Sequence, residues 1–231
     1  MLNRLLGLVL LLITLAPGAE AQSLRGDSLY RTTLLRAAPG RLLDLIGALK
    51  AKGVGAAGSK GLLLRHAQGD HWDLMILQQV AGYAQALKDD RSTSLASSEL
   101  ISWQEDEFVR GPDLETLPAF RDAGLYHAEM FHALADKRTE LLKERGMENA
   151  YAAELGRPQT AIFVREMGAS WDSFTLGAYR GWKHYAERDD IPKDKSASAA
   201  KAAGFVDVDQ IGATLRSLIL DHHDSLLTPV R

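Results

Sequence analysis

The sequence predicts an α+β protein in which one strand–helix–strand–strand–helix unit occurs twice. Two observations predict this fold class. The chain contains an internal repeat with an offset of about 96 to 99 residues. Within each copy, apolar residues alternate with polar ones in short segments, as in strands, and recur at helical spacing in longer ones. The composition is also that of a globular protein, since 46% of the 231 residues are hydrophobic and 25% are charged.

The repeat is defined by two blocks that occur in the same order in both copies. Leu29–Ala37 aligns without gaps on Leu125–Ala133, and Gly69–Asp73 aligns on Gly168–Asp172. The offset is 96 residues at the first block and 99 at the second, so it changes by only three residues. We therefore predict that the chain arose by duplication of one unit.

Each copy is predicted to begin with a strand that is followed by an amphipathic helix. In the first copy Leu42, Leu45, Ile46 and Leu49 form the apolar stripe of this helix. In the second copy the helix covers residues 136–155 and stops before a Gly-Arg-Pro sequence. The predicted strands are Leu29–Arg36, Gly61–Arg65 and Trp72–Leu77 in the first copy, and Leu125–His132, Thr160–Arg165 and Trp171–Leu176 in the second. A further helix is expected after each third strand, which gives the element order of a ferredoxin-like unit.

Two regions lie outside the repeat. Residues 89–120 are polar and are predicted to be a linker with some helix, in which Asp106–Arg110 could supply a fourth strand. The C-terminal region is predicted to be helical at Ser196–Ala203 and Val208–Leu220. The residues that would face the core from the second of these helices are Ile211, Leu215, Leu218 and Ile219.

The N-terminus has the pattern of a secretory signal peptide. Residues 1–21 contain one arginine, an apolar run of about twelve residues and an Ala-Glu-Ala sequence suited to cleavage. We therefore predict an exported protein, periplasmic in a Gram-negative bacterium and otherwise secreted. The run is too short to span a bilayer, so we expect no stable membrane insertion after cleavage. The remainder divides into residues 22–120, the first unit with its linker, and residues 121–231, the second unit with the C-terminal helices.

The charge and the cysteine count exclude several function classes. The formal net charge of -3 argues against nucleic acid as a partner, because nucleic-acid binders usually carry a basic surface. The chain has no cysteine, which excludes thiol catalysis, disulfides and thiolate metal sites.

The strand around Tyr126 and the Trp-Asp sequences at Trp72 and Trp171 resemble the dimeric α+β barrel superfamily, in particular its NIPSNAP and antibiotic-monooxygenase-like branches. The resemblance covers roughly residues 29–88 and 125–187. It implies two sheets packed face to face into one barrel with the helices outside, here a pseudo-dimer within one chain whose further association is left open. Members include cofactor-free monooxygenases, haem-binding peroxidases, chlorite-decomposing enzymes, isomerases and proteins without known activity.

Period-two alternation leads to an assignment of strand faces. The Tyr30 and Tyr126 sides of the first strands are predicted to pack under the helices, so that the opposite sides line the barrel. That assignment places His127 and Glu129 in the cavity as the candidate catalytic residues. The candidate ligand-binding residues are Arg31, Trp72, Phe131, Trp171, Ser173 and Thr175. Apolar walls with few polar groups are typical of a small-molecule pocket.

His127 and Glu129 stand two residues apart on one side of a strand, so the carboxylate could orient the imidazole as a general base. The structural alternative is an interior salt-bridge network with Arg31. The tryptophans, equally, could be core residues rather than ligand contacts.

The other histidines indicate no metal site. On a helix the neighbouring side chains of His222 and His223 would diverge by about 100°. Together with Asp224, the two histidines are residue types that bind metals, but adjacent positions on a helix do not direct their side chains to one ion. His184 is the histidine that could serve as an axial haem ligand. We therefore expect no cofactor, with haem as an alternative.

Three functions follow from these observations. The first is binding of a small apolar or aromatic molecule in the barrel, with cofactor-free monooxygenase or isomerase chemistry. The second is a non-catalytic ligand-binding or interaction protein of NIPSNAP-like type, and the third is a haem-binding protein. The sequence leaves open whether the protein is an enzyme.

Overall fold

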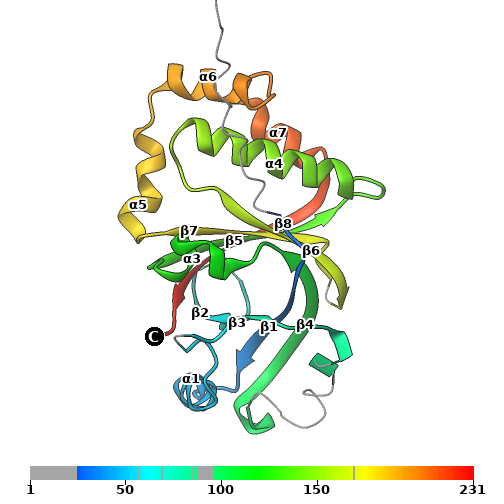
Figure 1. The fold of residues 1–231 in the computed structure, drawn as a ribbon, viewed down its shortest axis with the longest axis vertical. Helices are drawn as coiled ribbons and strands as arrows, with labels where there is room; N and C mark the ends of the chain where they lie inside the picture. Colours follow the sequence, from blue (N-terminus) through cyan, green and yellow to red (C-terminus); the bar gives the residue numbers. More distant parts are fainter. Residues whose placement is uncertain (1–24, 57, 69, 85, 88–95, 169) are drawn as a thin grey trace, which may run out of the picture.

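The computed structural model describes residues 25–56, 58–68, 70–84, 86–87, 96–168 and 170–231, so the predicted signal peptide lies outside the described residues. The strands of this part form a closed antiparallel barrel in the order β1-β3-β2-β8-β5-β7-β6-β4. The first half therefore has the strand order β4-β1-β3-β2 and the second half the order β8-β5-β7-β6, so in both halves the fourth strand lies beside the first. The fold is an α+β barrel made by one chain (Figure 1).

The element bounds define two similar halves. The first half consists of β1 (Ser28–Ala37), α1 (Leu42–Ala51), β2 (Gly61–Gln68), β3 (Leu74–Gln79), η1 (Ser98–Leu100) and β4 (Ile101–Gly111). The connection to the second half contains η2 (Leu114–Thr116) and α3 (Pro118–Arg121). The second half consists of β5 (Leu125–Ala133), α4 (Arg138–Glu154), β6 (Thr160–Gly168), β7 (Ser173–Tyr179), α5 (Trp182–Ala186), η3 (Glu187–Asp190), α6 (Lys193–Ala202), α7 (Gln210–Arg216) and β8 (Ile219–Pro229).

The helices cover the outside of the barrel. Figure 1 shows α1 beneath the sheet of the first half, and α4, α6 and α7 above the sheet of the second half. Leu45 and Leu49 of α1 are fully buried against the outer face of the first sheet. Leu141 of α4 packs with Phe131 on the outer face of the second sheet. No helix within the described ranges combines the length and apolarity that crossing a membrane requires.

The two aligned Trp-Asp sequences make the same contacts in both halves. The Asp73 carboxylate accepts a hydrogen bond of 2.8 Å from the backbone N–H of Ala37, and the Asp172 carboxylate accepts one of 2.9 Å from Ala133. Trp72 and Trp171 are both buried in the barrel core. These aspartates therefore fix the turn before the third strand against the end of the first strand. The duplication itself stays a prediction.

Two segments outside the repeat differ from the prediction. Residues 101–111 form the full-length strand β4, which confirms and extends the fourth strand expected at Asp106–Arg110. The helix predicted to run to Leu220 ends at Arg216, and Ile219–Pro229 is a strand that pairs with both β2 and β5. This last strand joins the two sheets, so the interpretation of the segment as helix was wrong.

The predicted strand faces are inverted. Tyr30, Leu34, Tyr126 and Met130 belong to the cluster that fills the barrel interior. The opposite sides of the same strands face outward, where Phe131 packs under α4. The prediction assumed that the side with more polar residues lines a cavity, whereas the barrel interior is filled by an apolar core and His127 and Glu129 lie on the outer side.

Candidate functional site

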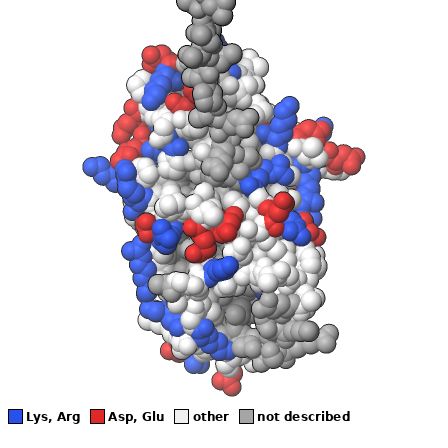
Figure 2. Space-filling view, viewed as in Figure 1, with Lys and Arg blue, Asp and Glu red and all other residues white. Residues whose placement is uncertain are grey.

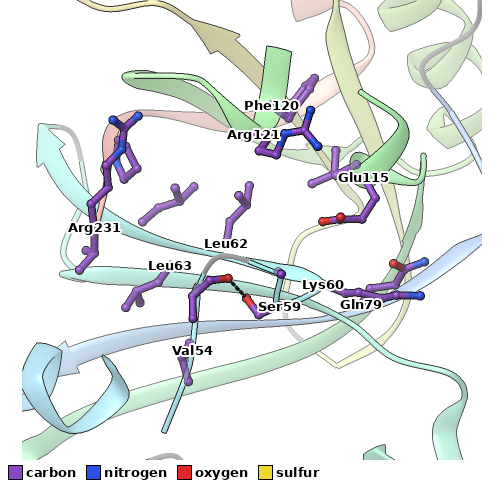
Figure 3. Close-up of a pocket in the computed structure, with 18 of the residues that line it drawn as sticks. Val54, Ser59, Lys60, Leu62, Leu63, Gln79, Glu115, Phe120, Arg121 and Arg231 are labelled. Carbon is purple, nitrogen blue, oxygen red and sulfur yellow. Dashed lines mark hydrogen bonds between the residues drawn. The ribbon is translucent and has the colours of Figure 1, made fainter. Parts of the chain in front are cut away.

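A pocket opens at one end of the barrel, which we call the barrel-mouth pocket. Its volume is about 480 Å³. Its apolar residues include Leu62, Leu64 and Phe120, together with the rings of Tyr30 and Tyr126. These residues come from β1, β2, β5 and the connection between the halves, so both halves of the chain contribute. Figure 3 shows Phe120 and Arg121 across the pocket from Leu62 and Leu63.

The rim of the barrel-mouth pocket is mainly basic. Lys50, Lys60, Arg121 and Arg231 line it together with one acidic residue, Glu115. In Figure 2 basic side chains gather along the left-hand edge, the side on which the C-terminus lies in Figure 1. Elsewhere on that face acidic and basic side chains are interspersed. The pocket therefore combines an apolar floor with a positive rim.

Two buried tyrosines define the inner wall of the pocket. The Tyr30 hydroxyl donates to the carbonyl of Pro112 at 2.8 Å and accepts from the N–H of Leu114 at 3.0 Å. The Tyr126 hydroxyl donates to the carbonyl of Phe120. Burial raises the pKa of each phenol to about 12. Both side chains are thus neutral structural elements that hold the connection between the halves against the barrel.

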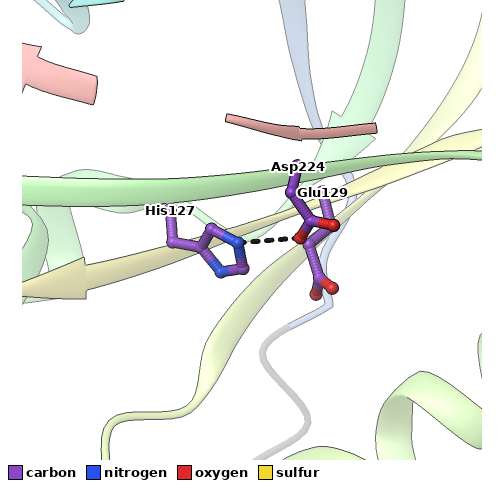
Figure 4. A group of neighbouring side chains, drawn as sticks. All are labelled: His127, Glu129 and Asp224. Atoms are coloured by element: carbon purple, nitrogen blue, oxygen red, sulfur yellow. Dashed lines mark hydrogen bonds and ion pairs between the residues drawn. The ribbon is translucent and has the colours of Figure 1, made fainter. Parts of the chain in front are cut away.

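The predicted catalytic pair does not face the barrel. His127 and Glu129 lie on the outer side of β5, where Glu129 contacts Arg145 of α4 at 3.6 Å. The structure brings them together with Asp224, from the neighbouring strand β8 (Figure 4). The His127 Nε2 atom lies 2.9 Å from Asp224 Oδ1, so Asp224, and not Glu129, is the direct partner of the imidazole.

His222 extends this group, which we call the outer-face cluster: His127, Glu129, His222 and Asp224. His222 Nε2 lies 3.3 Å from Asp224 Oδ2, so the Asp224 carboxylate stands between two imidazoles. The hydrogen bond with His127 holds the pKa of Asp224 below its ordinary value. Burial has the opposite effect on Glu129 and raises the pKa of that carboxyl.

Further acidic side chains surround Arg145 behind the outer-face cluster. Its guanidinium forms two hydrogen bonds with Glu144, at 2.7 and 2.8 Å, and one with Glu148 at 2.8 Å. Burial raises the pKa of Glu144 to about 7. Arg145 also lies 5.0 Å from the ring centre of Phe131. One buried arginine is thus shared among three carboxylates.

The predicted ligand-binding residues are spread over different environments. Arg31 pairs with Asp106 at 3.0 Å on the outer side of the first half, whereas Glu129 contacts Arg145 of α4. Phe131, Ser173 and Thr175 lie on the outer face of the second sheet, with Thr175 donating to Glu129 at 3.3 Å. The predicted residues that do contact the barrel core are Trp72 and Trp171.

A polar pair lies inside the barrel that the sequence did not indicate. Glu107 of β4 stands directly opposite Thr32 of β1, on the strand sides that also carry Tyr30 and Val109. Both side chains are buried, and neither Thr32 Oγ1 nor Glu107 Oε2 has a hydrogen-bond partner among the described residues. Burial, reinforced by Glu105, raises the pKa of Glu107 to about 8.

Haem, the alternative cofactor in the sequence-based expectations, does not fit the barrel-mouth pocket. Haem iron needs an axial histidine, cysteine, methionine or ionised tyrosine. None of the first three lines the pocket in the described part of the chain, and both pocket tyrosines have their hydroxyls bound to backbone groups. His184, the histidine considered as an axial ligand in the haem alternative, accepts a hydrogen bond at Nδ1 from the backbone N–H of Arg180 at 3.2 Å.

Comparison with known proteins supports the fold. No protein-family model and no curated protein matches the chain. Solved structures do match. The match to an anthrone oxidase-like protein has a TM-score of 0.58 and 12% sequence identity, and it covers 91% of this chain and 93% of the other. The match to a proposed chlorite dismutase has a TM-score of 0.55 and 10% identity and covers 88% of this chain and 95% of the other. The match to a proposed monooxygenase from Fusobacterium nucleatum has a TM-score of 0.54 and 9% identity and covers 89% of this chain and 94% of the other. At these identities the likeness shows the fold alone, which is that of the dimeric α+β barrels.

Proposed function

We propose that the protein binds a small molecule with an apolar body and an anionic group in the barrel-mouth pocket. The observation that carries the proposal is the combination of an apolar floor and a basic rim around about 480 Å³. Small-molecule sites commonly have volumes of roughly 300–1,000 Å³ and apolar walls with a few orienting polar groups. The pocket is large enough for a one- or two-ring compound.

The charges of the rim favour a carboxylate, sulfonate or phosphate on the ligand. Of the four basic residues, Lys50 donates to the backbone carbonyl of Arg231 at 2.6 Å, and Arg231 donates to that of Ala123 at 3.0 Å. These two side chains are thus held at the rim by hydrogen bonds to main-chain oxygens. An anion at the rim would be attracted by several cations while the ring lies against Leu62 and Phe120.

The proposal can be tested with 1-anilinonaphthalene-8-sulfonate, an aromatic sulfonate whose fluorescence rises in an apolar site. Lys60→Glu is expected to weaken its binding about threefold to tenfold, because one rim cation becomes an anion. Leu62→Trp is expected to abolish binding by filling the pocket. The matched controls are Lys201→Glu on α6 and Leu43→Trp on the exposed side of α1, which lie outside the pocket. Equal losses in the controls, or undiminished binding in both pocket variants, would overturn the proposal.

A second candidate is proton-transfer catalysis at the outer-face cluster. The 2.9 Å contact between His127 and Asp224 supports it, because a carboxylate fixes the orientation of a histidine that acts as general base. The likeness of the fold to an anthrone oxidase-like protein and a monooxygenase suggests oxygen uptake with anthrone as the assay. His127→Ala should abolish uptake while His132→Ala leaves it intact. If the wild-type protein takes up no oxygen with anthrone, this second candidate is refuted, and the first proposal, of a non-catalytic binding protein, stands.

We also propose that the protein is exported and that residues 1–21 are removed. The support is the sequence pattern of that segment. Expression of the full chain in a Gram-negative host should give a periplasmic product that begins at Gln22. A cytoplasmic product with Met1 intact would contradict export. Size-exclusion chromatography of the same material tests whether the barrel, closed within one chain, associates further.

A further inference from the structure

We propose that the outer-face cluster is a binding site for a first-row divalent transition-metal ion, with His127, Glu129 and Asp224 as ligands and His222 as the fourth. The inference is independent of the barrel-mouth pocket, which lies at the end of the barrel and shares no residue with this cluster.

The ligand atoms already lie close together. One atom from each of His127, Glu129 and Asp224 falls within 4.8 Å of the other two. Asp224 Oδ1 lies 2.9 Å from His127 Nε2, and Asp224 Oδ2 lies 3.3 Å from His222 Nε2. Both distances are close to the separation of about 3.3 Å between ligand atoms in a tetrahedral site with bonds near 2.0–2.1 Å.

The backbone fixes the positions of these side chains. Glu129 and Asp224 stand directly opposite each other in the pairing of β5 and β8, and His222 stands opposite Phe131. His127 lies two residues before Glu129, on the same side of β5. Ligands on adjacent paired strands of a closed barrel keep their spacing without a mobile loop.

Acidic groups predominate around the cluster. Glu129, Glu144, Glu148 and Asp224 are four carboxylates, and the ion pairs of the first three are with Arg145. Four carboxyl groups thus lie near one buried guanidinium, so the cluster has more acidic groups than Arg145 alone can pair with. A divalent cation among His127, Glu129 and Asp224 would supply a second positive partner for these groups.

The cluster also has supporting contacts and an entry route. Thr175 donates to Glu129 at 3.3 Å and Arg145 contacts the same carboxylate, so its orientation is held from behind. Such outer contacts orient metal ligands in known sites. The Asp224 side chain is about half exposed, at 51%, which leaves a path from solvent. Imidazole nitrogen together with carboxylate oxygen favours Zn²⁺, Mn²⁺, Fe²⁺ or Co²⁺ over Ca²⁺ and Mg²⁺.

The same two strands supply a matched control. His132 and Asp221 form a second histidine–aspartate pair, with 2.6 Å between Nδ1 and Oδ1. His132 points to the other side of β5 and stacks on Trp171. This pair has the residue types of the cluster and similar exposure, but within the described ranges it belongs to no group of three possible ligands.

The experiment is titration of chelator-treated full-length protein with Co²⁺, followed by its visible absorption bands, and with Zn²⁺ by calorimetry. We expect one ion per chain. Asp224→Asn and His127→Gln should weaken binding by at least about 100-fold and His222→Ala by about tenfold. Asp221→Asn and His132→Gln should bind as the wild type does.

Several results would overturn the proposal. The first is that the wild type binds no metal ion. The second is that Asp221→Asn loses as much metal affinity as Asp224→Asn does. The third is that Asp224→Asn binds the metal as tightly as the wild type. Circular dichroism identifies a variant that fails to fold. In that event the folded variants decide. Unchanged Co²⁺ bands and affinity in His222→Ala refute His222 as the fourth ligand. If the Co²⁺ affinity of His127→Gln is also unchanged, the whole site is refuted.

Discussion

Glu107 should make the stability of this protein fall as the pH rises. Its side chain is 3% exposed inside the barrel, and burial raises its pKa from an ordinary 4.5 to about 8. The unfolded chain releases the proton near pH 4.5, whereas the folded chain holds it until about pH 8. The contribution of Glu107 to stability is therefore fully present below about pH 4.5 and is lost as the pH rises through 8.

The magnitude follows from the two pKa values. Each pH unit between 4.5 and 8 costs about 1.4 kcal/mol of unfolding free energy, so the whole interval costs about 5 kcal/mol. The Gln side chain has the shape of the protonated acid and does not titrate. Glu107→Gln should therefore match the wild type at pH 4.5 to within about 1 kcal/mol and exceed its stability by about 5 kcal/mol at pH 9.

Urea unfolding at pH 4.5, 7 and 9, followed by the fluorescence of the buried Trp72 and Trp171, measures this difference. Taking the difference between variant and wild type cancels the titration of all other groups. Glu154→Gln, at the exposed end of α4, is the control for the substitution itself. A Glu107→Gln difference that does not change with pH would show that Glu107 ionises normally in the folded protein.

Three further substitutions test the packing of the barrel. Tyr30→Phe should lower the unfolding free energy by about 1–3 kcal/mol in urea unfolding, since the hydroxyl holds Pro112 and Leu114 in buried hydrogen bonds. Leu45→Ala, on the buried side of α1, should lower the unfolding free energy by about 2–5 kcal/mol in the same measurement. An effect below about 1 kcal/mol would show that α1 packs loosely. Gly168→Ala should lower the melting temperature in calorimetry, because Gly168 has φ +83° and its added Cβ would lie 2.5 Å from a backbone oxygen.

The sequence was informative where a local pattern determines a contact. The aligned Trp-Asp sequences predicted equivalent turns, and Asp73 and Asp172 indeed accept equivalent backbone hydrogen bonds. The order of strands and helices in the repeats was predicted for the same reason. The faces were predicted wrongly although β5 has a more polar side, with His127 and Glu129. That side was assigned to a cavity inside the barrel, whereas apolar side chains such as Tyr126 and Met130 fill the interior.

The last strand was missed for a different reason. Its centre is Asp-His-His-Asp, and aspartate is disfavoured in strands, while the preceding apolar residues have helical spacing. The tertiary pairing with β2 and β5 overrides both tendencies. The partnership of His127 with Asp224, 97 residues later in the chain, depends on that pairing, so the outer-face cluster could not be derived from local spacing.

The position of β8 between the two sheets has a consequence for how the chain folds. Leu64 of β2 pairs with Pro229 of β8, about 165 residues further on. The first sheet thus has an unpaired edge until β8 has been synthesised, and the barrel closes through one of the longest-range contacts the chain can make. Such contacts slow folding and leave strand edges open to association meanwhile. Folding intermediates of this protein should therefore be the species most prone to aggregate, at the edge that β8 finally covers.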